Sequence, residues 1–170
     1  MHQKKMESQA EYFSSYWGII NEDNNESFYD LDETFQNEII QLYKEIYSLT
    51  KYEVCTPEKR ENGEYIAEVK VYPINVMTLA NRASYTYQPL QDFIFEYTTD
   101  ELASMSAEEY AAYTLEYGRI ILQLVQERLE YAKPMEEKSV LMRLNLDDEM
   151  VLTLNEDDYA NFDNFFIYYP

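Results

Sequence analysis

The chain has 170 residues, and its 33 Asp and Glu outnumber its 13 Lys and Arg, so its formal net charge is −20 at pH 7. This charge argues against direct nucleic-acid binding, because an acidic surface repels phosphates. A single Cys and a single His exclude a disulfide framework, a Cys/His zinc site and His-based triads. With a hydrophobic fraction of 46%, we expect one folded domain over residues 1–170 rather than disorder.

Apolar side chains recur every three or four residues near the N-terminus, which predicts two helices. The first covers residues 3–21 and is followed by a polar loop at 21–27. The second follows Asp30, which with Glu33 three residues later resembles a capping box, and runs to about Leu49 with Asp32 and Glu33 in its first turn. Residues 1–31 are expected to attach more loosely than the rest of the domain.

The period then changes to two, which is typical of strands. Residues 52–56 and 65–72 flank Asn62-Gly63, and Asn-Gly between alternating runs indicates a hairpin with a type I′ turn. Pro73 cannot donate to a ladder, so the second strand should end near Tyr72. Residues 140–146 and 150–154 alternate in the same way around an acidic turn at 147–149, which predicts a second hairpin.

Further helices are expected between and after the hairpins. Residues 74–97 indicate either an irregular segment or a helix broken at Pro89. Two capping boxes, Thr98 with Glu101 and Ser106 with Glu109, indicate helix starts, and the second opens a long helix over about 107–132. Asn155 is placed to cap a last short helix.

This order of elements predicts the α+β class. We expect about four antiparallel strands in two hairpins, packed with an N-terminal helix pair, a long central helix and a short C-terminal helix.

Residues for catalysis or metal binding are mostly missing. Cys55 would need a general base to act as a nucleophile, and His2 lies at a terminus that should fray. The oxygens at residues 23–27 have the spacing of an EF-hand loop, but Phe28 stands at its glycine position and Thr34 at its bidentate Glu position. We therefore expect no catalytic residue, no metal site and no cofactor, and we expect that the protein is not an enzyme.

The 18 tyrosines are the feature that points to binding, because Tyr combines apolar area with a polar tip and is enriched at recognition surfaces. Four of them lie in segments that need not be core and are the candidate ligand-binding residues: Tyr85, Tyr87, Tyr168 and Tyr169. The alternative is that these tyrosines are ordinary core and strand residues.

Residues 42–54, 62–75, 105–129 and 147–169 together resemble the extracytoplasmic domain of a group of uncharacterised lipoproteins from Gram-positive gut anaerobes. In that family a helix pair precedes a hairpin, and a long helix, a second hairpin and a short acidic-capped helix follow. The chain departs from the family at Glu149, where the second turn usually has Gly, and it carries neither the signal peptide nor the lipidated Cys. The resemblance implies a location outside the cell membrane and a binding or scaffolding role, and it carries over no catalytic residue.

Three functions are therefore open. The first is a non-enzymatic binding or scaffolding domain of a cell-surface lipoprotein, which takes an unknown protein or small ligand and contacts the membrane only through a lipid anchor absent from this chain. The second is a cytosolic acidic inhibitor that imitates DNA and blocks a nuclease or restriction enzyme, so that its partner is a basic protein. The third is a glycan-active enzyme, which needs a pocket that holds two carboxylates with perturbed pKa values.

Overall fold

The computed structural model describes residues 2–20, 26–146, 151–155, 157–158, 162 and 165–170. The contacts within the chain divide it into two compact units. Unit 1 comprises Met1–Ile46 and Leu79–Tyr131, and unit 2 comprises Tyr47–Thr78 and Ala132–Pro170. The division falls inside two helices, and each unit is described by itself. The single domain expected from the sequence stays a prediction.

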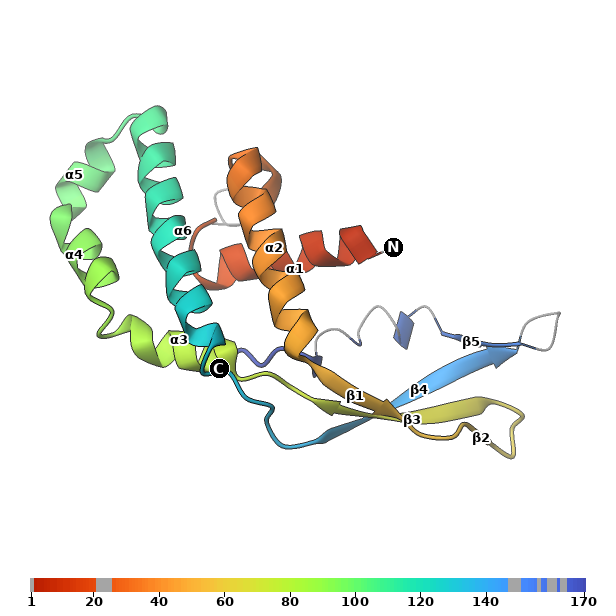
Figure 1. The fold of residues 1–170 in the computed structure, drawn as a ribbon. Helices are drawn as coiled ribbons and strands as arrows, with labels where there is room; N and C mark the ends of the chain where they lie inside the picture. Colours follow the sequence, from red (N-terminus) through yellow and green to blue (C-terminus); the bar gives the residue numbers. More distant parts are fainter. Residues whose placement is uncertain (1, 21–25, 147–150, 156, 159–161, 163–164) are drawn as a thin grey trace. The chain divides into compact units, whose positions relative to one another are not determined.

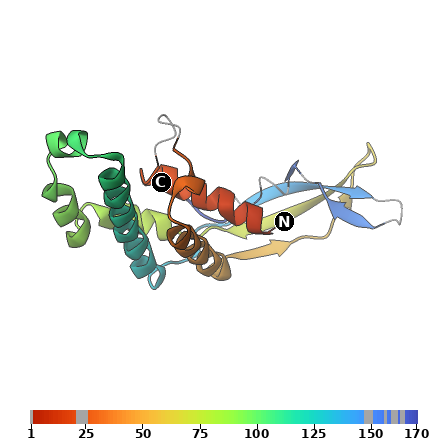
Figure 2. The same cartoon turned by 90° about the horizontal axis from the view of Figure 1, so that it is seen from above.

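Unit 1 is helical (Figure 1). Its elements are α1 (His2–Tyr16), η2 (Phe28–Asp30), α2 (Glu33–Leu49), α3 (Val76–Ser84), α4 (Gln88–Glu96), α5 (Thr99–Ser104) and α6 (Ala107–Leu129). Of α2 only the part up to Ile46 belongs to unit 1, and of α3 only the part from Leu79. α4 lies beside α6 in both views (Figure 2). The N-terminal helix pair and the long central helix are therefore present, as the sequence predicts.

The first helix ends earlier than predicted, at Tyr16 instead of residue 21. Gly18 adopts a φ of 69°, a left-handed conformation that glycine takes without strain. The chain reverses there, and the Ile19 N–H donates to the Ser14 carbonyl over 2.8 Å, which satisfies one of the last carbonyls of α1. This reversal turns Ile19 and Ile20 inward, where both are buried.

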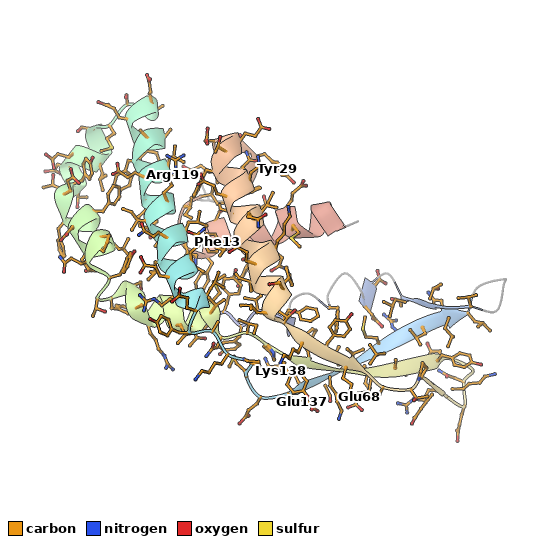
Figure 3. The ribbon with its side chains drawn as sticks, viewed as in Figure 1. Phe13, Tyr29, Glu68, Arg119, Glu137 and Lys138 are labelled. Carbon is orange, nitrogen blue, oxygen red and sulfur yellow. The ribbon has the colours of Figure 1, made fainter. Side chains whose placement is uncertain are left out.

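Aromatic side chains fill the core of unit 1. Phe13 is fully buried in α1, and its ring meets the ring of Tyr43 edge-on with centroids 6.1 Å apart (Figure 3). Phe35 is also fully buried and lies against α6 at Gly118. A Cβ atom at residue 118 would lie 2.5 Å from Cζ of Phe35, so α6 approaches α2 this closely because residue 118 has no side chain.

Two of the capping boxes predicted from the sequence are confirmed, and one N-cap is corrected. Thr98 and Ser106 each exchange hydrogen bonds with the Glu three residues later, at the starts of α5 and α6. α2 is capped by Asp32 rather than Asp30, since the Phe35 N–H donates to Asp32 Oδ1 over 3.0 Å. Asp30 instead belongs to the capping box of η2, a short helix that the sequence pattern did not indicate.

The segment at 74–97 forms two helices, α3 and α4. Pro89 lies in the first turn of α4, where its missing N–H costs nothing, because the first N–H groups of a helix have no intrahelical partner. The proline therefore starts a helix instead of breaking one. The Gln91 side chain ties α4 to α3 by donating from Nε2 to the Ser84 carbonyl over 2.9 Å.

Unit 2 contains one antiparallel sheet. Its strands are β1 (Lys51–Val54), β2 (Glu58–Lys59), β3 (Tyr65–Tyr72), β4 (Lys138–Leu146) and β5 (Leu152–Leu154). They follow the order β1-β3-β4-β5, and β2 pairs with β3. The two predicted hairpins are therefore joined through β3 and β4, and the α+β class is confirmed. The strand β2 was not predicted, and the turn at 147–149 lies outside the described residues.

The Asn-Gly hairpin is present, but its turn differs from the prediction. The Gly63 N–H donates to the Arg60 carbonyl over 2.9 Å, and the Arg60 N–H donates to the Glu64 carbonyl over 2.7 Å. The turn therefore comprises residues 60–63, and Gly63, with a φ of 90°, is its fourth residue. This is the pattern of a longer loop with glycine in the left-handed position, rather than of a two-residue type I′ turn.

One face of the sheet is apolar. The ladder register places Val69 beside Val54 and Val140, and Leu144 beside Leu154. Phe162 and Phe166 are buried, and both rings contact the ring of Tyr52 on this face. Farther along the strands the face is open: Val54 is 57% exposed and Leu154 is 44% exposed.

The opposite face of the sheet is mostly polar, although Leu141 is 60% exposed on it. Glu137 accepts a hydrogen bond from the Tyr72 hydroxyl over 2.9 Å and lies 3.8 Å from Nζ of Lys70 (Figure 3). Hydrogen bonding to Glu137 and its charge raise the pKa of Tyr72. Glu68 lies on the same face, because it alternates with the buried residues of β3.

Asp158 ties the segment after β5 to the sheet. Its carboxylate accepts from the Arg143 backbone N–H over 2.7 Å and from Nη2 of the Arg143 guanidinium over 2.6 Å. Asn155 Oδ1 accepts from the N–H groups of Asp157 and Asp158, so the predicted cap is confirmed. The predicted C-terminal helix itself falls mostly outside the described residues.

Replacing Asp158 by Asn is expected to lower the free energy of unfolding at pH 7, because charge-assisted hydrogen bonds to a partly exposed Arg are lost. The hydrogen bond from Arg143 holds the pKa of Asp158 below its ordinary value. The stabilisation is therefore present at neutral pH and is lost as the pH falls through the folded-state pKa. Urea titrations at pH 7 and pH 3 measure this, with Asp157→Asn as a control of equal charge. A difference between wild type and Asp158→Asn that does not shrink in acid would contradict the assignment.

Candidate functional site

A pocket of about 390 Å³ opens in unit 1, between the first turns of α6 and residues 19–20 and 26–32. Its apolar walls come from both sides. One side supplies Ile19, Ile20 and Leu31, and α6 supplies Leu115 and three alanines. The size lies within the range of about 300–1,000 Å³ that is common for small-molecule sites.

The side of the pocket that α6 forms leaves space for a ligand, because several of its side chains are small. Ala107, Ala111 and Leu115 follow one another at intervals of four, so they share one face of the helix, and Ala112 lies next to them. The facing wall exists because the chain reverses at Gly18 and directs Ile19 and Ile20 inward. The pocket therefore forms because a face of α6 with small side chains lies opposite the chain reversal at Gly18.

Acidic side chains line the other part of the pocket: Glu26, Asp30 and Asp32. Two of them are held in place by helix starts, since Asp30 Oδ2 accepts the Ser27 N–H and Asp32 Oδ1 accepts the Phe35 N–H, each over 3.0 Å. Among the described lining residues there is no Lys, Arg or His. The pocket is thus apolar inside and negative along one edge.

Tyr110 adds an aromatic ring to the lining and is 42% exposed. Its ring stacks on Tyr113, with centroids 6.2 Å apart and planes inclined by 26°. Tyr113 in turn stacks on Phe93 of α4 at 4.9 Å. Burial raises the pKa of Tyr113, so its hydroxyl stays neutral at physiological pH. This row of rings restricts the orientation of Tyr110 beside the pocket.

The described lining supplies hydroxyls and carboxylates as its polar side-chain groups. The Ser27 hydroxyl accepts from the Tyr29 N–H, as an N-cap does. In the part of the chain that the structure describes, no cluster of three His, Cys, Asp or Glu side chains is placed to hold a metal ion.

The four tyrosines predicted as ligand-binding residues fall in different units. Tyr85 lies between α3 and α4 and is 76% exposed. The Tyr87 hydroxyl donates to Glu127 Oε1 over 2.8 Å, and burial together with this hydrogen bond raises the pKa of Tyr87 to about 12. Tyr168 of unit 2 lies under Nζ of Lys138, 5.3 Å from the ring centroid, and Tyr169 follows it. Their role in binding stays a prediction.

The pocket residues were not predicted from the sequence. Alanines in a helix are unremarkable by composition, and Asp30 was interpreted only as a cap. The usable signal was the spacing of Ala107, Ala111 and Leu115, which leaves a face of the long helix with little bulk. Nothing in the sequence places that face beside residues 19–20 and 26–32.

The sequence matches no model of a known protein family and none of the curated proteins. The fold is similar to that of a "putative lipoprotein" (ycdA) from Bacillus subtilis, with a TM-score of 0.58 and 20% sequence identity. The similarity covers 96% of this chain and 45% of the Bacillus subtilis protein, so the chain spans less than half of its length. None of the helices in the described residues is both long and apolar enough to cross a bilayer.

Proposed function

We propose that this chain is the extracytoplasmic binding domain of a cell-surface lipoprotein and is not an enzyme. The observation that carries the binding role is the open pocket of unit 1, with apolar walls, an acidic edge and an aromatic ring. The location is supported by the fold shared with the Bacillus subtilis protein and by the family resemblance of residues 42–54, 62–75, 105–129 and 147–169.

Binding accounts for the pocket better than glycan cleavage does. A glycosidase needs one carboxyl group that donates a proton and a second that acts as base or nucleophile. Two of the three acidic lining residues, Asp30 and Asp32, accept backbone N–H groups at helix starts, so they act as structural caps. Carboxylates held in this way supply a fixed negative charge, which suits recognition of a positive group.

The location is tested by intact-mass analysis of the native protein in membrane and soluble fractions of its source cell. We expect a membrane-bound form whose mass includes acyl chains on a Cys other than Cys55. A protein found only in the soluble fraction, without acyl chains, would overturn the lipoprotein assignment and favour the cytosolic inhibitor.

A further inference from the structure

We propose that the pocket of unit 1 binds a small organic cation, in which an ammonium or guanidinium group is attached to an apolar body. This inference rests on the proposed binding function and names the chemistry of the ligand. It follows from three properties of the described lining: an apolar interior, a negative edge and an exposed aromatic ring.

The apolar walls of the pocket favour a ligand that has an apolar body. Ile19, Ile20, Leu31 and Leu115 surround it together with the alanines of α6, and a polar ligand would lose hydrogen bonds to water there without replacement. A volume of about 390 Å³ accommodates a ligand with on the order of ten to twenty heavy atoms, the scale of common small-molecule sites. A saturated or aromatic hydrocarbon chain is therefore the chemistry that these walls favour.

The positive group is required by the edge. Asp30 and Asp32 contribute carboxylates to one edge of the pocket, Glu26 also lines it, and the described lining contains no Lys, Arg or His. The net charge of −20 extends this field, since it attracts cations toward the surface and repels anions. An anionic ligand with the same apolar body would meet repulsion at the same place.

Tyr110 strengthens this preference for a cation. The face of a Tyr ring is negative, so a cation within about 6 Å of the ring centroid is attracted to it. The ring is 42% exposed and lines the pocket, and it stacks on Tyr113 with centroids 6.2 Å apart. A ligand amine at the acidic edge can therefore contact carboxylates and an aromatic face together.

The test compares three ligands of matched shape with the full chain, by isothermal titration calorimetry and by NMR: 4-phenylbutylamine, 4-phenylbutanol and 4-phenylbutyrate. We expect the amine to bind at least about tenfold more tightly than the alcohol, and the carboxylate to bind most weakly, because only the amine is complementary in charge. Raising the salt concentration should weaken the amine alone. A peptide that contains adjacent Leu and Lys residues and is blocked at both ends tests whether the pocket also binds an ammonium group carried by a polypeptide.

Variants locate the site. The double substitution Asp30→Asn with Asp32→Asn removes two charges, and Asn is as good as Asp at an N-cap, so α2 keeps its cap. We expect this variant to lose most of the preference for the amine over the alcohol. Glu116→Gln removes a charge from an exposed part of α6 that does not line the pocket, and it should preserve the preference. Ala111→Leu fills the pocket and should abolish binding of all three ligands.

The outcomes separate the two proposals. Equal affinity for the amine and the alcohol, with binding that Ala111→Leu abolishes, would overturn the cation preference and leave the binding function standing. Binding that Ala111→Leu does not change would overturn this pocket as the site, and with it both proposals for unit 1. If none of the three ligands binds, the cation proposal is overturned as well.

Discussion

Replacing Phe13 by Ala is expected to lower the free energy of unfolding by about 3–5 kcal/mol, as for other buried Phe residues. The ring is fully buried in α1, and besides its edge-on contact with Tyr43 it lies 6.4 Å from the ring of Trp17. Truncation removes this apolar area and these contacts and leaves a cavity that neighbouring aromatic rings cannot easily fill. Urea or thermal denaturation followed by circular dichroism measures the change.

Tyr12 provides the matched control, because it precedes Phe13 in the same helix and is 51% exposed. Tyr12→Ala removes an aromatic ring from the surface and should cost less than about 1 kcal/mol. The comparison also tests the expectation that residues 1–31 attach loosely. If Phe13→Ala proves as mild as Tyr12→Ala, the N-terminal helix contributes little to the folded core, and that expectation is right.

The elements that could be predicted from the sequence are those whose cause is local. A capping box needs only a side chain and a backbone N–H three residues apart, so Ser106 with Glu109 located the start of α6. Periodicity likewise located the buried side of α2, where Phe35 and Ile39 are fully buried. Both signals arise within one or two turns of chain and depend little on distant residues.

Details that depend on competing local choices were predicted less well. Pro89 is compatible with a break in a helix and with its first turn, and only the packing around α3 and α4 selects the second. Gly63 takes a left-handed conformation in several hairpin loops, so Asn62-Gly63 indicates a hairpin without specifying its loop. In both cases the residue type was informative, and its exact position within the turn was not.

Burial across the sheet depends on residues far away in the sequence. Alternation indicated which residues within each strand share a side, and the register of the sheet places Val54, Val69 and Leu154 on one face. It could not show that Val69 is buried while Val54 and Leu154 stay exposed, because the aromatic rings on this face come from the C-terminal segment at Phe162 and Phe166. An exposed apolar residue at a strand end has the same pattern as a buried one.

The pocket was beyond sequence prediction for a similar reason. It requires residues 19–20 and 26–32 to lie against residues 107–115, and the two parts are separated in the sequence by α2, β1–β3 and α3–α5. Composition drew attention to tyrosines, because they are numerous and adaptable. It did not distinguish Tyr110, whose ring borders the pocket, from Tyr85, which is merely exposed.

Gly118 is the position where the packing of α6 can be tested together with the pocket. A Cβ atom there would lie 2.5 Å from Cζ of Phe35 and 3.3 Å from Cγ2 of Ile19, and Ile19 lines the pocket. Ala is a better helix former than Gly by about 1 kcal/mol, so propensity alone predicts a gain in stability. We expect the opposite: Gly118→Ala should lower the free energy of unfolding by about 1–2 kcal/mol and Gly118→Val by about 3 kcal/mol, because Phe35 is buried and cannot move aside freely.

Chemical denaturation of both Gly118 variants measures this, with Glu116→Val as a control that places the same β-branched residue at an exposed position of α6. The control should cost less than about 1 kcal/mol, which is the propensity term alone. Displacement of Ile19 should also weaken binding of 4-phenylbutylamine in Gly118→Ala under conditions where the variant is fully folded, whereas Glu116→Val should bind it normally. An increase in stability for Gly118→Ala would mean that α6 and α2 do not approach as closely as the structure places them. The position of α6 beside the pocket would then be wrong as well.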